Sequence, residues 1–274
     1  MTDLKNHIDA NDHSAEKSPR PSKAPAISRA IAILRLLGRS EEALGVQSIA
    51  RELGLVPSTC LHVLRALVDE SLVSFNVHTK RYALEAGVLT LGQQWFKRNR
   101  FNSLAQPVLD RLNQEFNMTM VGLRIINQEH SIVVALSQRD PNIQLSTQIG
   151  SRFPSFEGAT GRCLAAFGQY SAAELKTRFK TLSWDNPPTF SEWKEQIEET
   201  FSRGIAIDRG SYISGVTVFL APVWDANAEL NHALIAFGIT EALHRTDVAA
   251  LEHALVSSAK SLTEQLQGKI QPFS

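Results

Sequence analysis

In the first third of the chain the apolar positions change from a helical spacing to a strand alternation. Residues 47–53 form one short amphipathic segment, and Gly54 follows it where a helix end needs a residue free to adopt a positive φ. A second helix is predicted from Pro57, which suits a first helical turn because its missing N–H would be unpaired there. Residues 72–75 and 80–84 then alternate apolar and polar side chains, as half-buried strands do. The stretch therefore predicts two helices followed by a β-hairpin.

The predicted second helix has an apolar face and a polar face. The residues of the apolar face recur at the helical period of 3.6: Cys60, Leu61, Leu64, Leu67 and Val68. The residues of the polar face are Ser58, Thr59, His62, Arg65 and Asp69. Because the polar side chains near the helix start are small, this half of the helix is suited to enter a DNA major groove.

The segments on either side of this stretch differ in character. Residues 1–24 are polar and have too little apolar surface to fold, so we expect a disordered tail and favour a solvated extension over nonspecific phosphate contacts. A first helix is predicted from the apolar positions Ile27, Ile31, Leu34 and Leu37. A connecting helix is predicted from the spacing of Val88, Leu91, Trp95 and Phe96.

A mixture of helices and strands fills the rest of the chain. Helices are expected at residues 104–116, along the glycine-rich segment 157–167, from the capping box at 171–174, at 191–201 and along 248–266. Strands are expected at residues 118–126, 131–137, 143–149, 216–224 and 232–240. Strands with helices at both ends favour an α+β domain with a mostly antiparallel sheet.

Composition limits the classes of protein. A chain of 274 residues fits two domains, its 43% hydrophobic content is ordinary, and no apolar run is long enough to cross a bilayer. The two cysteines provide no disulfide framework, and the first residues lack the apolar core of a signal peptide. A reducing cytoplasm is therefore the expected compartment, with no membrane partner.

The charge is divided unevenly although the net charge is zero. Residues 17–100 hold 13 Lys and Arg against 6 Asp and Glu, whereas residues 101–274 hold 14 against 18. A basic first part and a mildly acidic second part are typical of a DNA-binding module that carries a separate domain.

These patterns carry a resemblance to a known family. The sequence from Ser28-Arg29-Ala30 through the helix pair to Arg81-Tyr82-Ala83-Leu84 resembles the winged helix-turn-helix domain of the IclR family of bacterial transcription regulators. The C-terminal part resembles the GAF-like effector-binding domain of that family, so the resemblance covers nearly the whole chain after residue 25. It implies a tail at 1–24, a DNA-binding domain at 25–85, a linker helix at 86–100 and an effector-binding domain at 101–270. It also implies a homodimer or homotetramer that represses or activates genes from double-stranded operator DNA.

The candidate DNA-contacting residues come from the polar faces and from the resemblance, which places a phosphate contact at Arg29. They are Arg29, Gln47, Pro57, Ser58, Thr59, His62, Arg65, Lys80 and Arg81. Two positions depart from the family pattern. His62 stands where the family often has Arg, which alters the expected operator preference, and Ser71 stands where it often has Gly, which leaves open how that turn is made.

The candidate effector site starts from the loop Gly158–Gly161, where small side chains leave N–H groups at a helix start accessible to a carboxylate. The resemblance adds positions on the strands, which gives the set Gly158, Ala159, Thr160, Asp208, Val218, Ile235 and Phe237. Relatives that bind small keto acids tend to have Cys or Ser at the last three positions. The apolar residues here favour a larger acid that is more hydrophobic or aromatic, and the alternative is that Ile235 and Phe237 are plain core.

Two other classes of protein remain as alternatives. An enzyme would use Cys163 as its nucleophile, but the sequence supplies no base for it and no metal-binding spacing, so we expect no cofactor and no metal. A ligand-independent architectural DNA-binding protein would leave the second domain unexplained. For the linker, the alternative to pairing in a dimer is that Trp95 folds back on its own domain.

Overall fold

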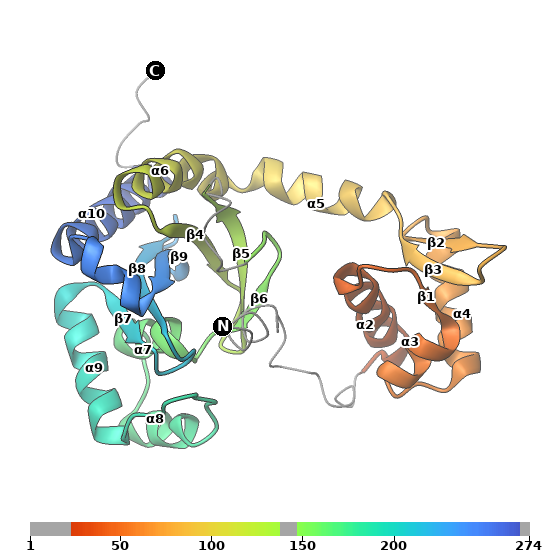
Figure 1. Cartoon of the computed structure of the whole chain (residues 1–274), viewed down its shortest axis with the longest axis horizontal. Helices are drawn as coiled ribbons and strands as arrows, with labels where there is room; N and C mark the ends of the chain where they lie inside the picture. Colours follow the sequence, from red (N-terminus) through yellow and green to blue (C-terminus); the bar gives the residue numbers. More distant parts are fainter. Residues whose placement is uncertain (1–22, 138–146, 269–274) are drawn as a thin grey trace. The chain divides into compact units, whose positions relative to one another are not determined.

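The N-terminal unit combines helices with a small three-stranded sheet. The computed structural model describes residues 23–137 and 147–268, and these residues divide between Asn99 and Arg100 into two compact units (Figure 1). The helices of the first unit are α2 (Pro25–Arg39), α3 (Val46–Glu52), α4 (Pro57–Asp69) and α5 (Gly87–Arg98). Its strands are β1 (Leu44–Gly45), β2 (Val73–Asn76) and β3 (Arg81–Leu84), paired antiparallel in the order β1-β3-β2. The predicted helix pair and hairpin are confirmed.

Helices α3 and α4 end in the same kind of turn. Gly54 after α3 has a φ of 62°, as its position predicted, and Ser71 after α4 has a φ of 58°. Beyond α4 the Ser71 N–H donates to the Val68 carbonyl at 2.9 Å and the Leu72 N–H to the Leu67 carbonyl at 3.0 Å, the pair of bonds that satisfies a helix C-terminus. Ser71 therefore adopts the left-handed conformation usually left to glycine, and no other type of turn replaces it.

The β2–β3 hairpin closes without a glycine. The side chain of Asn76 forms the turn, and Lys80 adopts the positive φ that a glycine would usually provide. The Asn76 side-chain Oδ1 accepts hydrogen bonds from the N–H groups of His78 and Thr79 at 2.9 and 3.0 Å. The Lys80 N–H donates to the Asn76 carbonyl at 2.9 Å, and Lys80 itself has a φ of 56°. An asparagine side chain thus builds the turn, as this residue commonly does.

The core of the first unit corrects one prediction. Helix α2 contributes Ile33, Leu36 and Leu37 to a cluster with Ile49, Ala50, Cys60, Leu64, Leu67, Val73 and Tyr82. The predicted first helix is present as α2, but Ile27 and Ile31 are 66% and 41% exposed, so only Leu34 and Leu37 of the four predicting positions pack in the core. The buried face is rotated because it follows the residues that meet α4 and β3.

The C-terminal unit is an α+β domain, and this predicted fold class is confirmed. Its helices are α6 (Arg100–Phe116), α7 (Gly158–Phe167), α8 (Ala172–Phe179), α9 (Phe190–Arg203) and α10 (Val248–Leu266), with the 3₁₀ helix η1 (Thr240–Arg245). Its strands are β4 (Thr119–Ile125), β5 (His130–Leu136), β6 (Arg152–Pro154), β7 (Ala206–Arg209), β8 (Val216–Trp224) and β9 (Leu230–Ile239). They form one antiparallel sheet in the order β6-β5-β4-β9-β8-β7.

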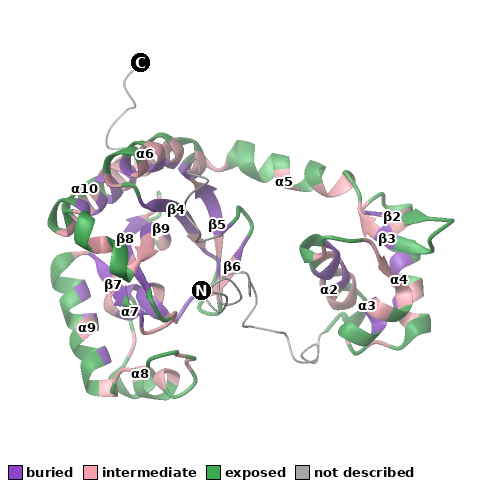
Figure 2. Ribbon diagram, in the orientation of Figure 1, coloured by how far each residue is buried: buried purple, intermediate pink, exposed green. Residues whose placement is uncertain are grey.

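Helices cover both faces of this sheet. On one face α6 and α10 lie side by side (Figures 1 and 2). Leu109 and Leu255 are among the fully buried residues of these two helices. On the other face α7 and α9 pack together over a second cluster that includes Ala159, Trp193 and Leu220. Successive residues of a strand point to opposite faces, so strands β4, β5, β7, β8 and β9 supply residues to both clusters. The sheet is therefore the layer from which the candidate effector residues project.

Some of the strands expected from the sequence differ from those in the structure. The strand expected at 143–149 falls mostly outside the described residues, and its described part, 147–149, forms no strand. The short strands β1, β6 and β7 were not predicted. Within the described ranges, no helix is long and apolar enough to cross a bilayer.

Candidate functional site

Helix α4 presents its predicted polar face to solvent. Pro57 occupies the first turn, and Ser58, His62 and Arg65 are exposed, whereas Thr59 is half-buried. Cys60, Leu64 and Leu67 are the residues that the helix buries against the rest of the unit. Ser58, His62 and Arg65 therefore share one accessible side of this helix, and Gln47 of α3 is exposed as well. Arg29 on α2 is half-buried.

The two basic residues of the hairpin have different environments. Lys80 is exposed at the tip, with its Nζ 5.9 Å from the centre of the Phe75 ring. Arg81 is also exposed, but its Nη1 donates to the Ala43 carbonyl at 3.0 Å and lies 3.5 Å from the Glu42 carboxylate. Arg81 thus ties β3 to the residues before β1, while Lys80 is exposed beside the Phe75 ring.

The candidate effector residues on the strands share one face of the C-terminal sheet. Asp208 of β7 pairs with Val218 of β8, and Val218 pairs in turn with Phe237 of β9. Ile235 pairs with Leu220, one row further along the same face. Residues that are directly opposite in a sheet point to the same side, so the strand candidates project together toward α7 and α9. Val218 and Phe237 are half-buried, whereas Ile235 is buried in the cluster beneath α7.

The first turn of α7 faces these residues and is packed without room for larger side chains. Gly158 has a φ of 56°, and a Cβ built on it would lie 3.2 Å from the Tyr212 Cβ and 3.4 Å from the Asp208 Oδ2. A Cβ on Gly161 would lie 1.8 Å from the Phe156 carbonyl oxygen. Ala159 is buried and Thr160 half-buried, and the Glu157 side chain makes no capping hydrogen bond. The N–H groups of this turn thus have no side-chain cap among the described residues.

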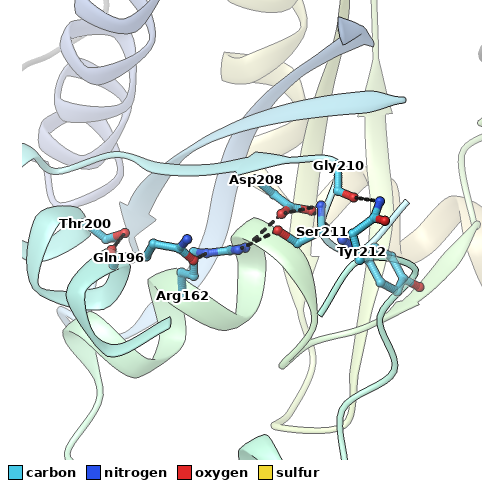
Figure 3. Close-up of polar contacts among 8 residues, drawn as sticks. Arg162, Gln196, Thr200, Asp208, Gly210, Ser211 and Tyr212 are labelled. Atoms are coloured by element: carbon cyan, nitrogen blue, oxygen red, sulfur yellow. Dashed lines mark hydrogen bonds and ion pairs between the residues drawn. The ribbon is translucent and has the colours of Figure 1, made fainter. Parts of the chain in front are cut away.

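A buried ion pair between Arg162 and Asp208 joins α7 to the end of β7 (Figure 3). The Arg162 Nη1 lies 3.1 Å from the Asp208 Oδ1, and the two side chains are 1% and 2% exposed. The Arg162 Nε donates to Gln196 Oε1 of α9 at 2.7 Å, and its Nη2 donates to the Ser211 hydroxyl at 3.3 Å. Burial lowers the pKa of the Arg162 guanidinium, and the Asp208 carboxylate opposes that shift. The guanidinium stays protonated, as arginine does in proteins.

Asp208 also organises the loop that follows it. Its Oδ1 accepts a hydrogen bond from the Ser211 N–H at 3.2 Å, and its Oδ2 accepts one from the Tyr212 N–H at 3.0 Å (Figure 3). Burial, followed by the neighbouring Glu157 carboxylate, raises the pKa of Tyr212, whose side chain hydrogen-bonds to Glu157. Both oxygens of the Asp208 carboxylate therefore bind groups of the protein. A direct contact between Asp208 and an effector stays a prediction.

The sequence did not single out Arg162, Gln196 or Ser211 as part of this site. Arginine and glutamine are usually exposed, so nothing in the local pattern distinguishes a buried one. One signal was available, because Arg162 occupies a position between Gly161 and Cys163 in a helix that is otherwise small and apolar. A charged residue in such a helix requires a buried partner.

The structure gives Cys163 no role as a nucleophile. Its side chain is fully buried in the cluster beneath α7, and burial raises the pKa of its thiol. A protonated, inaccessible thiol is a packed small residue. Among the residues that the structure describes, no group of three or more His, Cys, Asp or Glu side chains is placed to hold a metal ion.

A winged helix-turn-helix unit joined to an α+β domain is the architecture of a ligand-responsive DNA-binding regulator. Two family models match the chain: "IclR helix-turn-helix domain" over residues 26–76 and "Bacterial transcriptional regulator IclR C-terminal" over residues 93–264. The chain belongs to the IclR family of bacterial transcription regulators. It is accordingly a regulator with an N-terminal DNA-binding domain and a C-terminal effector-binding domain, and not an enzyme.

Individual relatives agree with this assignment. The chain is 28% identical over 221 residues to a glycerol operon regulatory protein of Streptomyces griseus, in a match that covers 80% of this chain and 85% of that protein. It is 20% identical over 251 residues to the transcriptional repressor IclR of Escherichia coli, covering 90% and 91% of the two chains.

Solved structures share the fold. A regulator from Alicyclobacillus acidocaldarius superposes with a TM-score of 0.76 at 23% identity, over 88% of this chain and 98% of that one. A homologue from Microbacterium hydrocarbonoxydans, solved in complex with 4-hydroxybenzoate, superposes with a TM-score of 0.74 at 14% identity, over 89% and 99% of the two chains.

Proposed function

We propose that this regulator reads its operator through the exposed face of α4 and the tip of the β2–β3 hairpin. The observation that carries the proposal is the accessible row Ser58, His62 and Arg65, on a helix whose opposite side forms the core. Side chains of these types donate to base edges and phosphates in a major groove. The further candidates for contacts at the edges of this surface are Arg29, Gln47, Pro57, Thr59, Lys80 and Arg81.

The DNA proposal is tested with the purified full chain and its own promoter fragment. Replacing both His62 and Arg65 by Ala is expected to weaken binding by at least tenfold, since each good base contact is worth about 1–3 kcal/mol. Exchanging the exposed Glu70 for Gln, just beyond α4, serves as the control and should leave the affinity within about twofold. Full retention of affinity by the double variant would place the DNA surface elsewhere.

We further propose that the effector is a small organic acid, aromatic acids included, whose carboxylate meets the first turn of α7. That turn offers N–H groups without a side-chain cap, and a helix N-terminus favours an anion. The half-buried Val218 and Phe237 supply an apolar surface on the same side of the sheet, which suits a ring better than a short keto acid. The complex of the Microbacterium homologue with 4-hydroxybenzoate is a precedent for an aromatic acid in this fold.

A thermal-shift screen against aliphatic and aromatic carboxylic acids tests the effector proposal, because a ligand of the folded state raises the melting temperature by mass action. We expect an aromatic acid to give the largest shift and Phe237→Ala to abolish it. Phe201→Ala, which changes an exposed ring of α9, is the matched control and should keep the shift. If no acid raises the melting temperature of a protein that still binds its promoter, the proposed effector class is wrong and the regulator assignment stands.

The proposed assembly is a homodimer, or a homotetramer built from it, in the bacterial cytoplasm where operator DNA lies. Helix α5 buries none of its residues (Figure 2). Its Leu91 and Trp95 are 68% and 40% exposed. An apolar helix face of this kind needs a partner, and a second copy would match a two-fold operator. Analytical ultracentrifugation of Leu91→Glu is expected to show dissociation, whereas Gln93→Glu, which adds the same charge on the same helix, should not. A monomeric wild-type protein overturns the proposal.

A further inference from the structure

One buried cation balances one buried anion beside the first turn of α7. The Arg162 and Asp208 side chains are at most 2% exposed and lie 3.1 Å apart, so neither charge is screened by water. The pair is neutral as a whole. Either charge alone would act strongly on anything bound nearby, because the surroundings have a low dielectric constant.

Asp208 lies where its charge matters for an anionic ligand. Its Oδ2 is 3.4 Å from the position that a Cβ would have on Gly158, which places the carboxylate directly beside the turn proposed to receive an acid. An unbalanced carboxylate at that distance would repel an incoming anion. The Arg162 guanidinium, which contacts the other carboxylate oxygen of Asp208, neutralises the negative charge that would cause this repulsion.

Arg162 is itself held in one orientation, and it holds Asp208 in turn. Gln196 fixes its Nε and Ser211 contacts its Nη2, while the guanidinium carbon lies 5.7 Å from the centre of the Trp184 ring. The Asp208 carboxylate in turn accepts hydrogen bonds from the N–H groups of Ser211 and Tyr212. The contacts connect α9, α7, β7 and the loop after β7 through a single guanidinium (Figure 3).

We propose that Arg162 is a positioning residue of the effector site: it neutralises Asp208 and keeps it in place, so that the first turn of α7 accepts an anion. The proposal rests on the effector part of the proposed function. It makes Arg162 a determinant of ligand charge although its side chain is fully buried and need not touch the ligand.

The test compares benzoate with benzamide, which has the same shape and no charge, by calorimetric titration of the full chain at pH 7.5. In Arg162→Met we expect the affinity for benzoate to fall at least tenfold more than the affinity for benzamide, because Asp208 is left unbalanced. The double variant Arg162→Met with Asp208→Asn buries no charge, and its benzoate-to-benzamide ratio should return to within about threefold of wild type. If Arg162 had a purely structural role, the affinities for benzoate and benzamide would fall equally in both variants, and that result overturns the proposal.

Two further measurements separate the ways in which the proposal could fail. Arg178→Met removes an arginine of α8 that also stacks on aromatic rings but is only half-buried, and it should leave the ratio unchanged. Hydrogen exchange needs no ligand: the Ser211 and Tyr212 amides should exchange at least tenfold faster in Arg162→Met than in wild type, and unchanged rates overturn the positioning role. If wild type binds neither benzoate nor any acid of the thermal-shift screen, the effector proposal fails and the charge-selective role of Arg162 falls with it.

Discussion

At the scale of single residues, His232 couples the stability of the C-terminal unit to pH. It is buried on β9, stacked on Phe101 with ring centres 4.2 Å apart, and its Nε2 lies 3.2 Å from the Arg124 Nη1. Burial, and then Arg124, lower the pKa of His232 to about 3, against the weaker opposing effect of Asp225. Between about pH 3 and its ordinary pKa of 6.5, the folded chain therefore binds fewer protons at this site than the unfolded chain does.

Stability should consequently fall as the pH drops below 6.5. For one full proton the slope approaches about 1.4 kcal/mol per pH unit. Urea unfolding of the full chain at pH 7.5, 6.5 and 5.5 measures this slope, and His232→Gln is expected to reduce it. His253→Gln, an exposed histidine of α10, is the control and should retain the wild-type slope. Equal slopes in wild type and His232→Gln would contradict the prediction.

Ser71 gives a second prediction at this scale. Its φ of 58° costs a serine more than a glycine, because only glycine lacks the Cβ that clashes in the left-handed region. Ser71→Gly should therefore raise the free energy of unfolding of the N-terminal unit by ~1 kcal/mol. Ser48→Gly, inside α3, should lower it by a similar amount. Hydrogen exchange of the Ile49 and Leu64 amides in the full chain reports both changes, and a destabilised Ser71→Gly would refute the strain argument.

The sequence was informative about residues whose neighbours are close in the chain. The outward face of α4 follows from its own periodicity, and the positive φ of Gly54 follows from its place after a short helix. The ion pair of Arg162 with Asp208 has no such local basis, since the two residues meet only when α7 packs against β7. Buried polar contacts of this kind depend on tertiary packing, and periodicity alone does not reveal them.

At the scale of elements, length and regular alternation decided what could be predicted. The nine residues of β8 and the nineteen of α10 span several repeats of their pattern, and both were identified. Strands β1 and β6 have two and three residues, too few for any periodicity to appear. Strand β7 has four residues, as β2 does, but its apolar and polar residues do not alternate. The strand conformation of β1, β6 and β7 comes from pairing with β3, β5 and β8, which is a property of the folded sheet.

The start of α5 provides a prediction about an element as a whole. A Cβ on Gly87 would lie 2.2 Å from the Ser71 carbonyl oxygen, so this helix begins in direct contact with the turn after α4. Gly87→Ala must displace one backbone or the other, and we expect it to destabilise the N-terminal unit by about 3 kcal/mol. On the same helix, a Cβ on Gly92 would have no neighbour within 4 Å. Gly92→Ala should therefore stabilise the N-terminal unit by about 0.5–1 kcal/mol. Chemical denaturation of both variants checks the contrast, and equal effects would remove the packing argument.

At the scale of the whole molecule, the two units carry different charges for different ligands. The basic residues gather in the part of the chain that includes α2 to α5, and the acidic excess lies in the part that forms the effector-binding domain. This division is a property of the sequence alone, and it correctly indicated which end of the chain holds the DNA-binding domain. The identity of the effector has no comparable signal, because it depends on side chains of β7, β8, β9 and α7 that the fold brings together from distant positions.

The division predicts opposite responses to salt. Phosphate contacts release counterions, so the logarithm of operator affinity should fall linearly and steeply with the logarithm of salt concentration. Arg65→Ala should make that slope shallower by about 1 for each phosphate that the arginine neutralises, and hence by about 2 in a two-fold complex. Binding of an organic acid, by contrast, is proposed to depend on the buried first turn of α7, where screening is weak, and should change little over the same range. Fluorescence anisotropy of labelled promoter DNA and calorimetry of the acid, both between about 50 and 200 mM salt, measure the two slopes. A flat slope for DNA would mean that the basic surface of the N-terminal unit does not face the phosphates.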